Sequence, residues 1–382
     1  MQDMLFEQGP IRPPSEAFSL LLRFTRNCPW NNCEFCPVYK GTRFSSRPVK
    51  EILRDIDAVR FILDDLKERS WKHGYGGELT REFISEILRD PNLNELYKHV
   101  AAWAYRGNFT VFIQDANSLI MKTDHLVKAI RYLKEKIPQI TRITTYGRAS
   151  TIARKSLEEL KELKDAGLTR IHVGMESGSD KVLKLVKKGI TAKQLISSGH
   201  KVKQAGITLS EYLMPGLGGK DLWEEHALLS AQVINEIDPD FIRLRTLHII
   251  PGTPLFVKYK KGDFKKLTED EVVKEIRLFI ENLDGITSTL TSDHIANLLE
   301  EVEGKFPEDK EKMLGVIDEY LSLPDEDRIL FRLGRRGGGL RSVKELADPY
   351  IKQRLKSAKE ELESSEDKDI DELIEEMGYQ YI

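Results

Sequence analysis

The sequence predicts an α/β fold with a parallel sheet, wound either as a doubly wound sheet or as a barrel. Two observations predict it. Strand-like segments alternate with amphipathic helical patterns, as parallel strands joined by helical crossovers require. The alternation covers about 240 residues, close to the length of a (β/α) barrel. The whole chain has 382 residues, enough for two domains or for one large α/β domain with an appendage.

Six segments rich in aliphatic, β-branched or aromatic residues are the predicted strands. They are 19–25, 109–114, 141–145, 169–175, 207–213 and 241–249. Amphipathic patterns predict the helices between them, at about 49–69, 156–166, 180–188, 191–204 and 221–237. Two of these patterns stop at a glycine, Gly167 and Gly206, a residue typical of helix ends.

Strand signals fade after Pro254. We expect residues from about 265 to 382 to be helical, interrupted by a glycine-rich loop at 334–339 and ending in a highly charged helix or tail. The predicted domains are therefore an α/β domain over 15–260 and a helical C-terminal region over 261–382.

The composition is that of an ordinary globular protein. Lys and Arg number 59 against 62 Asp and Glu, giving a formal net charge of −3. This balance argues against bulk electrostatic capture of nucleic acid or of an anionic membrane. No apolar run approaches the ~20 residues that span a bilayer, and the N-terminal residues lack the pattern of a secretory signal. We expect a cytoplasmic protein with no membrane partner.

The three cysteines, Cys28, Cys33 and Cys36, lie within one nine-residue loop directly after the first predicted strand. An odd number of thiols so close together does not form a disulfide framework. The C-x4-C-x2-C spacing suggests metal ligands, since thiolates bind zinc or iron–sulfur clusters. Structural zinc needs a fourth ligand, and the nearest histidine, His73, is about 40 residues away. A [4Fe–4S] cluster is therefore favoured over zinc and over three unrelated buried cysteines.

Polar or glycine-rich sequences follow the other predicted strands. Because the carboxyl ends of parallel strands meet at one edge of a sheet, we expect these loops to share one face. The loops are 115–117, 146–148, 176–179, 214–216 and 251–254.

These features resemble the radical SAM superfamily, whose usual loop is C-x3-C-x2-C, one residue shorter in its first gap. The sequence from Gly174 to Gly189 (GMESGSDKVLKLVKKG) is similar to the branch that holds the methylthiotransferases, the Elongator catalytic subunit and oxygen-independent coproporphyrinogen oxidase. The resemblance extends over residues 18 to about 260. It implies a partial (β/α)6 TIM-like barrel, followed here by the helical C-terminal extension.

The resemblance also implies roles for individual residues. The three cysteines would ligate a [4Fe–4S] cluster, and the other positions would bind S-adenosylmethionine. Phe35 would lie against the adenine, and Glu176, with Ser177 beside it, would contact the ribose or the methionine moiety. The methionine amino group would meet Asp115 and Asn117, and its carboxylate would meet Lys188 or Arg148.

Some of these side chains also have a simpler interpretation. Glu176 could favour the N-terminus of the next helix, Lys188 could be a surface lysine, and Asp115 a turn residue. Gly76-Gly77-Glu78 looks like a triplet that such enzymes use for the methionine amine, but a loop is favoured because no strand precedes it.

Further candidates lie toward the C-terminus. Arg243 and Arg245 alternate along the sixth predicted strand and would share a face, where they could contact an anionic substrate. His248 and His294 are weaker candidates for substrate contact. The arginines around the glycine-rich loop could contact phosphate or RNA, although a solvated linker is favoured; they are Arg332, Arg335, Arg336 and Arg341.

The resemblance implies an enzyme that cleaves S-adenosylmethionine reductively, with electrons from a reductant such as ferredoxin or flavodoxin. No cysteine remains for a second cluster, which argues against sulfur insertion of the methylthiotransferase kind. We therefore expect a 5′-deoxyadenosyl radical to abstract hydrogen from a small molecule. The alternative substrates are an RNA or a peptide. Two other possibilities are a non-catalytic iron–sulfur or zinc module and use of S-adenosylmethionine as a methyl donor.

Overall fold

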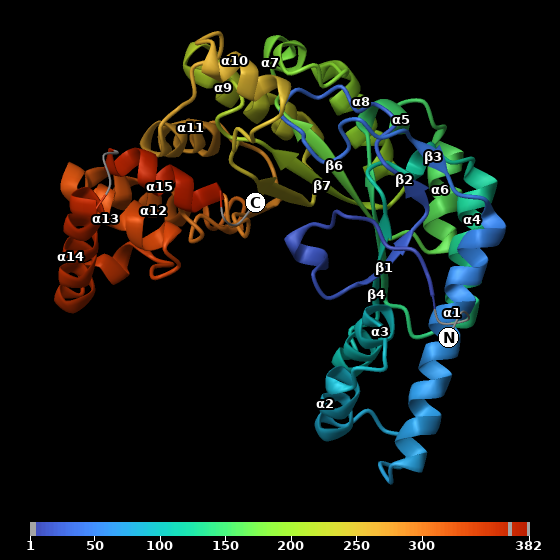
Figure 1. The fold of residues 1–382 in the computed structure, drawn as a ribbon. Helices are drawn as coiled ribbons and strands as arrows, with labels where there is room; N and C mark the ends of the chain where they lie inside the picture. Colours follow the sequence, from blue (N-terminus) through green and yellow to red (C-terminus); the bar gives the residue numbers. More distant parts are fainter. Residues whose placement is uncertain (1–4, 366–368, 380–382) are drawn as a thin grey trace. The chain divides into compact units, whose positions relative to one another are not determined.

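In the computed structural model, which describes residues 5–365 and 369–379, parallel strands alternate with helices as predicted (Figure 1). The packing contacts divide the chain into two compact units. The first unit comprises residues 1–31, 38–173 and 198–209, and the second comprises 32–37, 174–197 and 210–382.

The first unit contains a parallel sheet in the order β1, β4, β5, β6. Its strands are β1 (Leu20–Arg23), β4 (Thr110–Gln114), β5 (Arg142–Gly147) and the first part of β6 (Arg170–Glu176). Strands β2 (Thr25–Arg26) and β3 (Ser45–Ser46) form a separate antiparallel pair. Its helices are α1 (Val49–Lys72), α2 (Arg81–Arg89), α3 (Glu95–Arg106), α4 (Thr123–Lys136), α5 (Ala149–Ile152), α6 (Leu157–Ala166) and the second half of α8 (Ala192–Gln204).

Helix α6 shows how the sequence sets these boundaries. Ser156 and Glu159 form a reciprocal capping box at its start, and Gly167, with a φ of 124°, ends it. Its buried face, Leu160 and Leu163, packs beside α4.

Strand β6 passes from the first unit into the second, and β7 (Thr208–Leu213) runs beside it. Thr208 bonds to the carbonyl of Thr169 at one end, and Met214 bonds to the carbonyl of Glu176 at the other. Within the second unit β7, β8 (Phe241–Leu244) and β9 (Thr289–Thr291) are parallel, and β10 (Gly304–Lys305) is antiparallel to β9. Each parallel strand is therefore added beside the previous one. This order is that of a singly wound β/α fold, and the doubly wound alternative is wrong.

The helices of the second unit cover this sheet and build the C-terminal part. They are α7 (Asp180–Leu185), the start of α8, α9 (Gly219–Ile237), α10 (Pro254–Lys260), α11 (Glu269–Glu281), α12 (Lys310–Ser322), α13 (Asp325–Arg336), the short 3₁₀ helix η4 (Val343–Ala347), α14 (Pro349–Ser365) and α15 (Ile370–Tyr379). Two further 3₁₀ helices, η2 (Pro14–Glu16) and η3 (Ser118–Ile120), belong to the first unit. The predicted α/β class with a helical C-terminal part is confirmed. The division into units follows other boundaries than 260/261, which stays a prediction.

Two expectations about the later elements are wrong. Residues after 265 are not all helical, because β9 pairs with β8 and extends the parallel sheet. It was missed because it is only three residues long and lies in a Ser/Thr-rich segment. The strand expected over 241–249 ends at Leu244.

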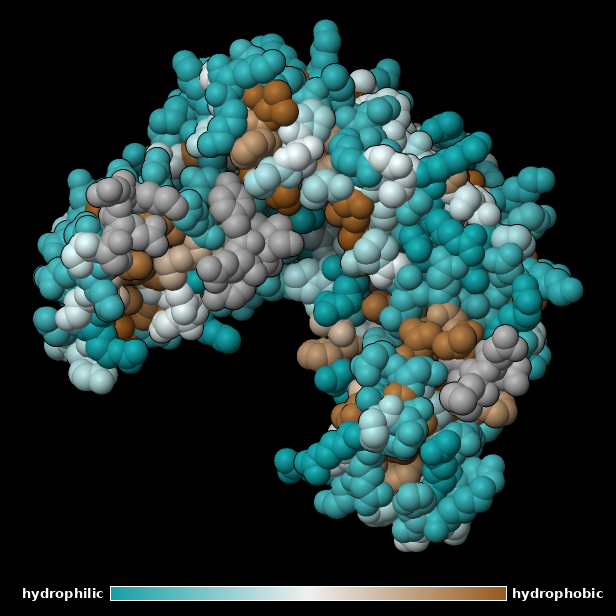
Figure 2. All heavy atoms as spheres, viewed as in Figure 1, coloured by the Kyte–Doolittle hydropathy of each residue, from teal (hydrophilic) through white to brown (hydrophobic). Residues whose placement is uncertain are grey.

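Hydrophobic residues on the face drawn in Figure 2 form separate small groups among hydrophilic ones. Within the described ranges, none of the helices combines the length and the hydropathy that crossing a membrane requires.

Candidate functional site

A buried ion pair lies in the second unit where β6 ends. Lys188 Nζ is 2.6 Å from Glu176 Oε1, and each side chain is only 12% exposed. Glu176 has a φ of 64°, a left-handed conformation uncommon for a residue with a side chain. Gly174 leaves room for the carboxylate, because a Cβ there would lie 2.3 Å from Glu176 Oε1. The sequence predicted both Glu176 and Lys188, and the structure brings them together.

Glu211, in β7, is a buried carboxylate that the sequence analysis missed. It is fully buried, and neither carboxylate oxygen has a hydrogen-bond partner among the described residues. Burial, and then the neighbouring Glu176, raise the pKa of Glu211 well above its usual value, while Lys188 opposes the shift. A glutamate in the middle of the predicted strand 207–213 was the available signal.

A second buried ion pair supports the backbone of Glu176. His226, from α9, faces the Glu275 carboxylate of α11 through Nδ1, and its Nε2 donates to the Glu176 carbonyl at 3.1 Å. Both ring nitrogens therefore face acceptors, which requires a protonated imidazole. Burial alone would lower the pKa of His226, but the Glu275 carboxylate outweighs it and raises that pKa. Glu275 also accepts from the Gly216 N–H at 2.7 Å, so the pair connects the loops after β6 and β7.

The turn between β6 and α7 shows that Glu176 does not cap the next helix. The cap is Ser179, whose hydroxyl accepts from the Val182 N–H at 3.3 Å. Ser177 is buried and its hydroxyl accepts from the Ser179 N–H at 3.0 Å. A Cβ at Gly178 would lie 2.2 Å from the Leu229 carbonyl, so only glycine fits there. The Glu176 side chain is thus left for Lys188.

The cysteine loop belongs to the first unit up to Asn31 and to the second from Asn32. Cys33 is buried, Cys28 and Cys36 are partly exposed, and none of the three forms a disulfide. Across the described part of the chain, no three His, Cys, Asp or Glu side chains form a preformed metal-binding group. The chemistry of the donor set nevertheless fits an iron–sulfur cluster, since three closely spaced thiols supply soft ligands.

Phe35 lies between the last two cysteines and packs against the apolar cluster around Val182, Val186 and Leu255. Lys188 Nζ is 5.9 Å from the centroid of its ring. The aromatic side chain predicted to meet the adenine therefore lies beside the Glu176–Lys188 pair.

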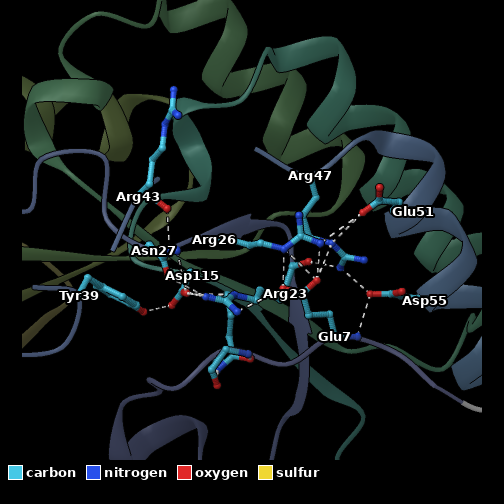
Figure 3. A network of polar contacts seen from close by, with 12 residues as sticks. Glu7, Arg23, Arg26, Asn27, Tyr39, Arg43, Arg47, Glu51, Asp55 and Asp115 are labelled. Carbon is cyan, nitrogen blue, oxygen red and sulfur yellow. Dashed lines mark hydrogen bonds and ion pairs between the residues drawn. The ribbon is translucent and has the colours of Figure 1, made fainter. Parts of the chain in front are cut away.

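Asp115, in the first unit, belongs to a network of arginines and carboxylates (Figure 3). Its carboxylate accepts from Arg23 at 2.7 and 3.1 Å, from the Asn27 N–H at 3.2 Å and from the Tyr39 hydroxyl. The network continues through Glu7, which bonds to Arg23 at 3.2 Å. Protein donors thus already occupy the carboxylate predicted to meet the methionine amino group.

Asn117 and Arg148 join the loops after β4 and β5. Asn117 Oδ1 accepts from the Arg148 N–H at 3.0 Å, and its Nδ2 donates to Thr151 Oγ1 at 2.8 Å. The Arg148 guanidinium lies 5.1 Å from the ring centroid of Trp30, which is in the cysteine loop. The polar residues at these two strand ends therefore meet, as expected for parallel strands.

Arg243 and Arg245 do not share a strand face as expected, because β8 ends between them. Arg243 is buried and donates to Ser210 Oγ at 3.1 Å, and it pairs with Asp293 at 3.2 Å. Arg245 is exposed beyond the strand end. Burial, with a contribution from Arg245, lowers the pKa of His294 to about 4.

The glycine-rich loop expected from 334 begins only after α13 ends at Arg336, so the expectation of a solvated linker is wrong for three of the four arginines around it. Arg332, Arg335 and Arg336 lie in α13 and are buried. They pair with Asp371, Glu300 and Glu269 respectively. Only Arg341 is exposed, as expected.

A cavity of about 210 Å³ lies in the second unit beside the loops that follow β7 and β8. Its lining includes His248, Tyr259, Lys266, Arg332, Arg336 and Ile374. Burial, and then Arg336 and Lys266, lower the pKa of His248 to about 3, so this histidine is neutral at pH 7. Three candidates that looked unrelated in sequence, His248, Arg332 and Arg336, therefore line one cavity.

The Gly76-Gly77-Glu78 triplet lies in the loop between α1 and α2, as favoured.

Residues 79–230 match the family model described as the Radical SAM superfamily. Over 122 residues the chain is 29% identical to a protein named tRNA uridine(34) acetyltransferase from Methanocaldococcus infernus, covering 32% of this chain and 23% of that protein. Over 171 residues it is 24% identical to human Elongator complex protein 3, covering 44% of this chain and 30% of that protein. The chain thus spans under a third of the length of these relatives.

Among solved structures, methylornithine synthase aligns with a TM-score of 0.42 at 16% identity, covering 73% of this chain and 68% of that one. The Elp3 of Methanocaldococcus infernus aligns with a TM-score of 0.40 at 20% identity, covering 48% of each chain. The family match includes the Glu176–Lys188 pair and Glu211. The resemblance to the radical SAM superfamily that the sequence predicted is confirmed over residues 79–230, and with it the prediction of an enzyme.

Proposed function

We propose that this chain is an enzyme that holds a [4Fe–4S] cluster on Cys28, Cys33 and Cys36, binds S-adenosylmethionine beside Glu176 and Lys188, and acts on a small molecule. The bound cluster would supply one electron that cleaves S-adenosylmethionine to methionine and a 5′-deoxyadenosyl radical, which takes a hydrogen atom from the substrate.

Glu211 is the observation that carries this proposal. A fully buried carboxylate without a donor is costly in a folded protein, and a ligand that donates hydrogen bonds to it would remove this cost. Vicinal hydroxyls, such as those of a ribose, would supply two donors to its two oxygens. Lys188, which pairs with Glu176 at 2.6 Å, would also offer its charge to an anionic group of the ligand.

The protein's own contribution is to fix these groups before the ligand arrives. His226 holds the carbonyl of Glu176, and Gly174 leaves space for its side chain. Phe35 offers an apolar ring face beside Lys188. Together these residues provide an apolar surface with a few polar anchors, as sites for nucleoside-containing ligands do.

The cavity beside the ends of β7 and β8 favours a small substrate. Its volume of about 210 Å³ suits a small molecule, and a neutral histidine lines it. The lining cations are paired with acids, so we expect an overall uncharged or weakly charged substrate group there.

The test is anaerobic reconstitution with iron and sulfide, followed by addition of dithionite and S-adenosylmethionine. We expect 5′-deoxyadenosine and methionine to form in equal amounts, and both to be lost in the Cys36→Ser variant. Flavodoxin or ferredoxin should replace dithionite as the reductant. A reconstituted protein that holds no iron would contradict the proposal.

RNA modification is the second candidate, because two relatives are named for tRNA uridine(34) or for Elongator. The Arg148–Trp30 pair offers an aromatic and cationic surface on which a base could stack. If a tRNA pool stimulates formation of 5′-deoxyadenosine and small-molecule extracts do not, this candidate replaces the first. The acetyl transfer in the name of the first of these relatives is not part of the proposal.

A further inference from the structure

Glu34 lies between Cys33 and Cys36, and its carboxylate is buried. The side chain is only 3% exposed, and Lys187 Nζ and Lys258 Nζ lie 2.8 and 2.5 Å from its two oxygens. An acidic residue is an unexpected choice beside thiolate ligands, because like charges repel. The two lysines offset that repulsion.

The backbone of Glu34 is held as firmly as its side chain. Its N–H donates to the Val186 carbonyl at 2.9 Å, and its carbonyl accepts from the Leu255 N–H at 3.0 Å. The short segment 32–37 is therefore fastened at four points to two elements of its own unit, the end of α7 and the start of α10.

The same end of α7 supplies the predicted ligand-binding lysine. Lys187, at a φ of 51°, holds Glu34, and its neighbour Lys188 holds Glu176 at 2.6 Å. Any movement of the Cys33–Cys36 segment away from α7 would break the contacts of Glu34 first. The position of this segment is thus coupled to that of the Glu176–Lys188 pair.

We propose that Glu34 is a positioning residue that fixes the Cys33–Cys36 segment against α7 and α10, so that two cluster ligands are in place before iron binds. This inference rests on the proposed function, because it treats the two thiols as ligands. It concerns the residue between the cysteines and assigns no chemical step to it.

The test compares Glu34→Gln with a matched control, Glu225→Gln. Both substitutions remove a carboxylate that pairs with a lysine near α7, but Glu225 pairs with the exposed Lys181 and is far from the cysteines in sequence. Apo protein is treated with iodoacetamide, and the alkylation rate of each cysteine is followed by peptide mass spectrometry. Cys28 serves as the internal reference.

We expect Glu34→Gln to raise the alkylation rates of Cys33 and Cys36 about tenfold, as freer local opening would, and to leave Cys28 and the control unchanged. In reconstituted protein, bathophenanthroline should remove iron from Glu34→Gln faster by a similar factor. If the full-length variant does not fold, Lys258→Met carries the same test, because it removes one cation and leaves the carboxylate.

Alkylation rates of Cys33 and Cys36 within twofold of the unsubstituted protein would overturn the inference. This readout needs no iron, so it stands apart from the proposed function. If the protein never holds a cluster but the alkylation rates rise, Glu34 still positions the segment and the function assigned to the thiols is wrong.

Discussion

Asp115 in the first unit and Glu211 in the second are both fully buried carboxylates of a parallel β/α fold, but their surroundings differ. Asp115 accepts from Arg23, Asn27 and Tyr39 (Figure 3), so protein donors already occupy its oxygens. Glu211 has no donor within the described ranges and lies near Glu176, another acid. A satisfied buried charge holds a structure together, whereas an unsatisfied one indicates a place for a ligand.

This difference predicts the largest loss of stability at Asp115. Asp115→Ala should lower the free energy of unfolding by roughly 3–5 kcal/mol, because it leaves Arg23 and Tyr39 without their buried partner. Urea unfolding followed by circular dichroism measures this. A loss below about 1 kcal/mol would show that solvent or Glu7 replaces Asp115, and the network would not be a structural one.

His226→Gln tests the support of Glu176. A glutamine can still donate to the Glu176 carbonyl but carries no charge for Glu275, so we expect a loss of roughly 2–3 kcal/mol at pH 6. The raised pKa means that His226 keeps its proton to a higher pH in the folded protein than in the unfolded chain. The stabilisation is therefore complete below about pH 6.5 and is lost as pH rises through the folded pKa.

This dependence is measured by the unfolding free energies of the unsubstituted protein and of His226→Gln at pH 6 and pH 9. The difference between the two unfolding free energies should be smaller at pH 9. A gap that widens with pH would mean that His226 is neutral in the folded protein.

Glu211→Gln should raise the free energy of unfolding, whereas His226→Gln lowers it. The raised pKa of Glu211 means that the folded protein binds a proton that the unfolded chain has released, so stability falls as pH rises above about 4.5. The slope from this one group is at most about 1.4 kcal/mol per pH unit. The variant lacks this slope and should be the more stable protein at pH 8, by roughly 1–3 kcal/mol. Equal pH profiles of the two proteins would show that Glu211 is not desolvated.

The smallest effect is expected at the rim of the first network. Glu51 is one-third exposed and lies 3.4 Å from Arg26, so Glu51→Gln should cost less than about 1 kcal/mol. The same unfolding titration measures it, and salt should reduce the difference further. A loss as large as that of Asp115→Ala would remove the distinction between the buried centre and the rim.

The sequence was sufficient for features with a local signal. Alternating patterns predicted the strands and helices. The capping box of α6 is visible in the sequence as a serine followed three residues later by a glutamate, and the cysteine loop as three cysteines within nine residues. Glu176 and Lys188 were predicted separately through a resemblance, and the structure places them in contact. The role of each in binding a ligand stays a prediction.

Features that depend on packing could not be predicted. His226 and Glu275 lie on different helices and are 49 residues apart in the sequence, so no spacing rule predicts their contact. Arg332, Arg335 and Arg336 looked solvated because arginines beside glycines usually are, but α13 buries them against acids from distant segments. Strand β9 forms because it pairs with β8, and its own three residues carry too little signal to predict that pairing.

The affinity of reconstituted protein for S-adenosylmethionine, measured anaerobically by titration calorimetry, tests most directly whether Glu211 is part of a ligand site. Glu211→Leu removes both acceptor oxygens and leaves an apolar side chain of similar size, with Glu51→Gln as the control. The account predicts that Glu211→Leu weakens binding about tenfold or more while the protein becomes no less stable. Unchanged affinity in Glu211→Leu would contradict it.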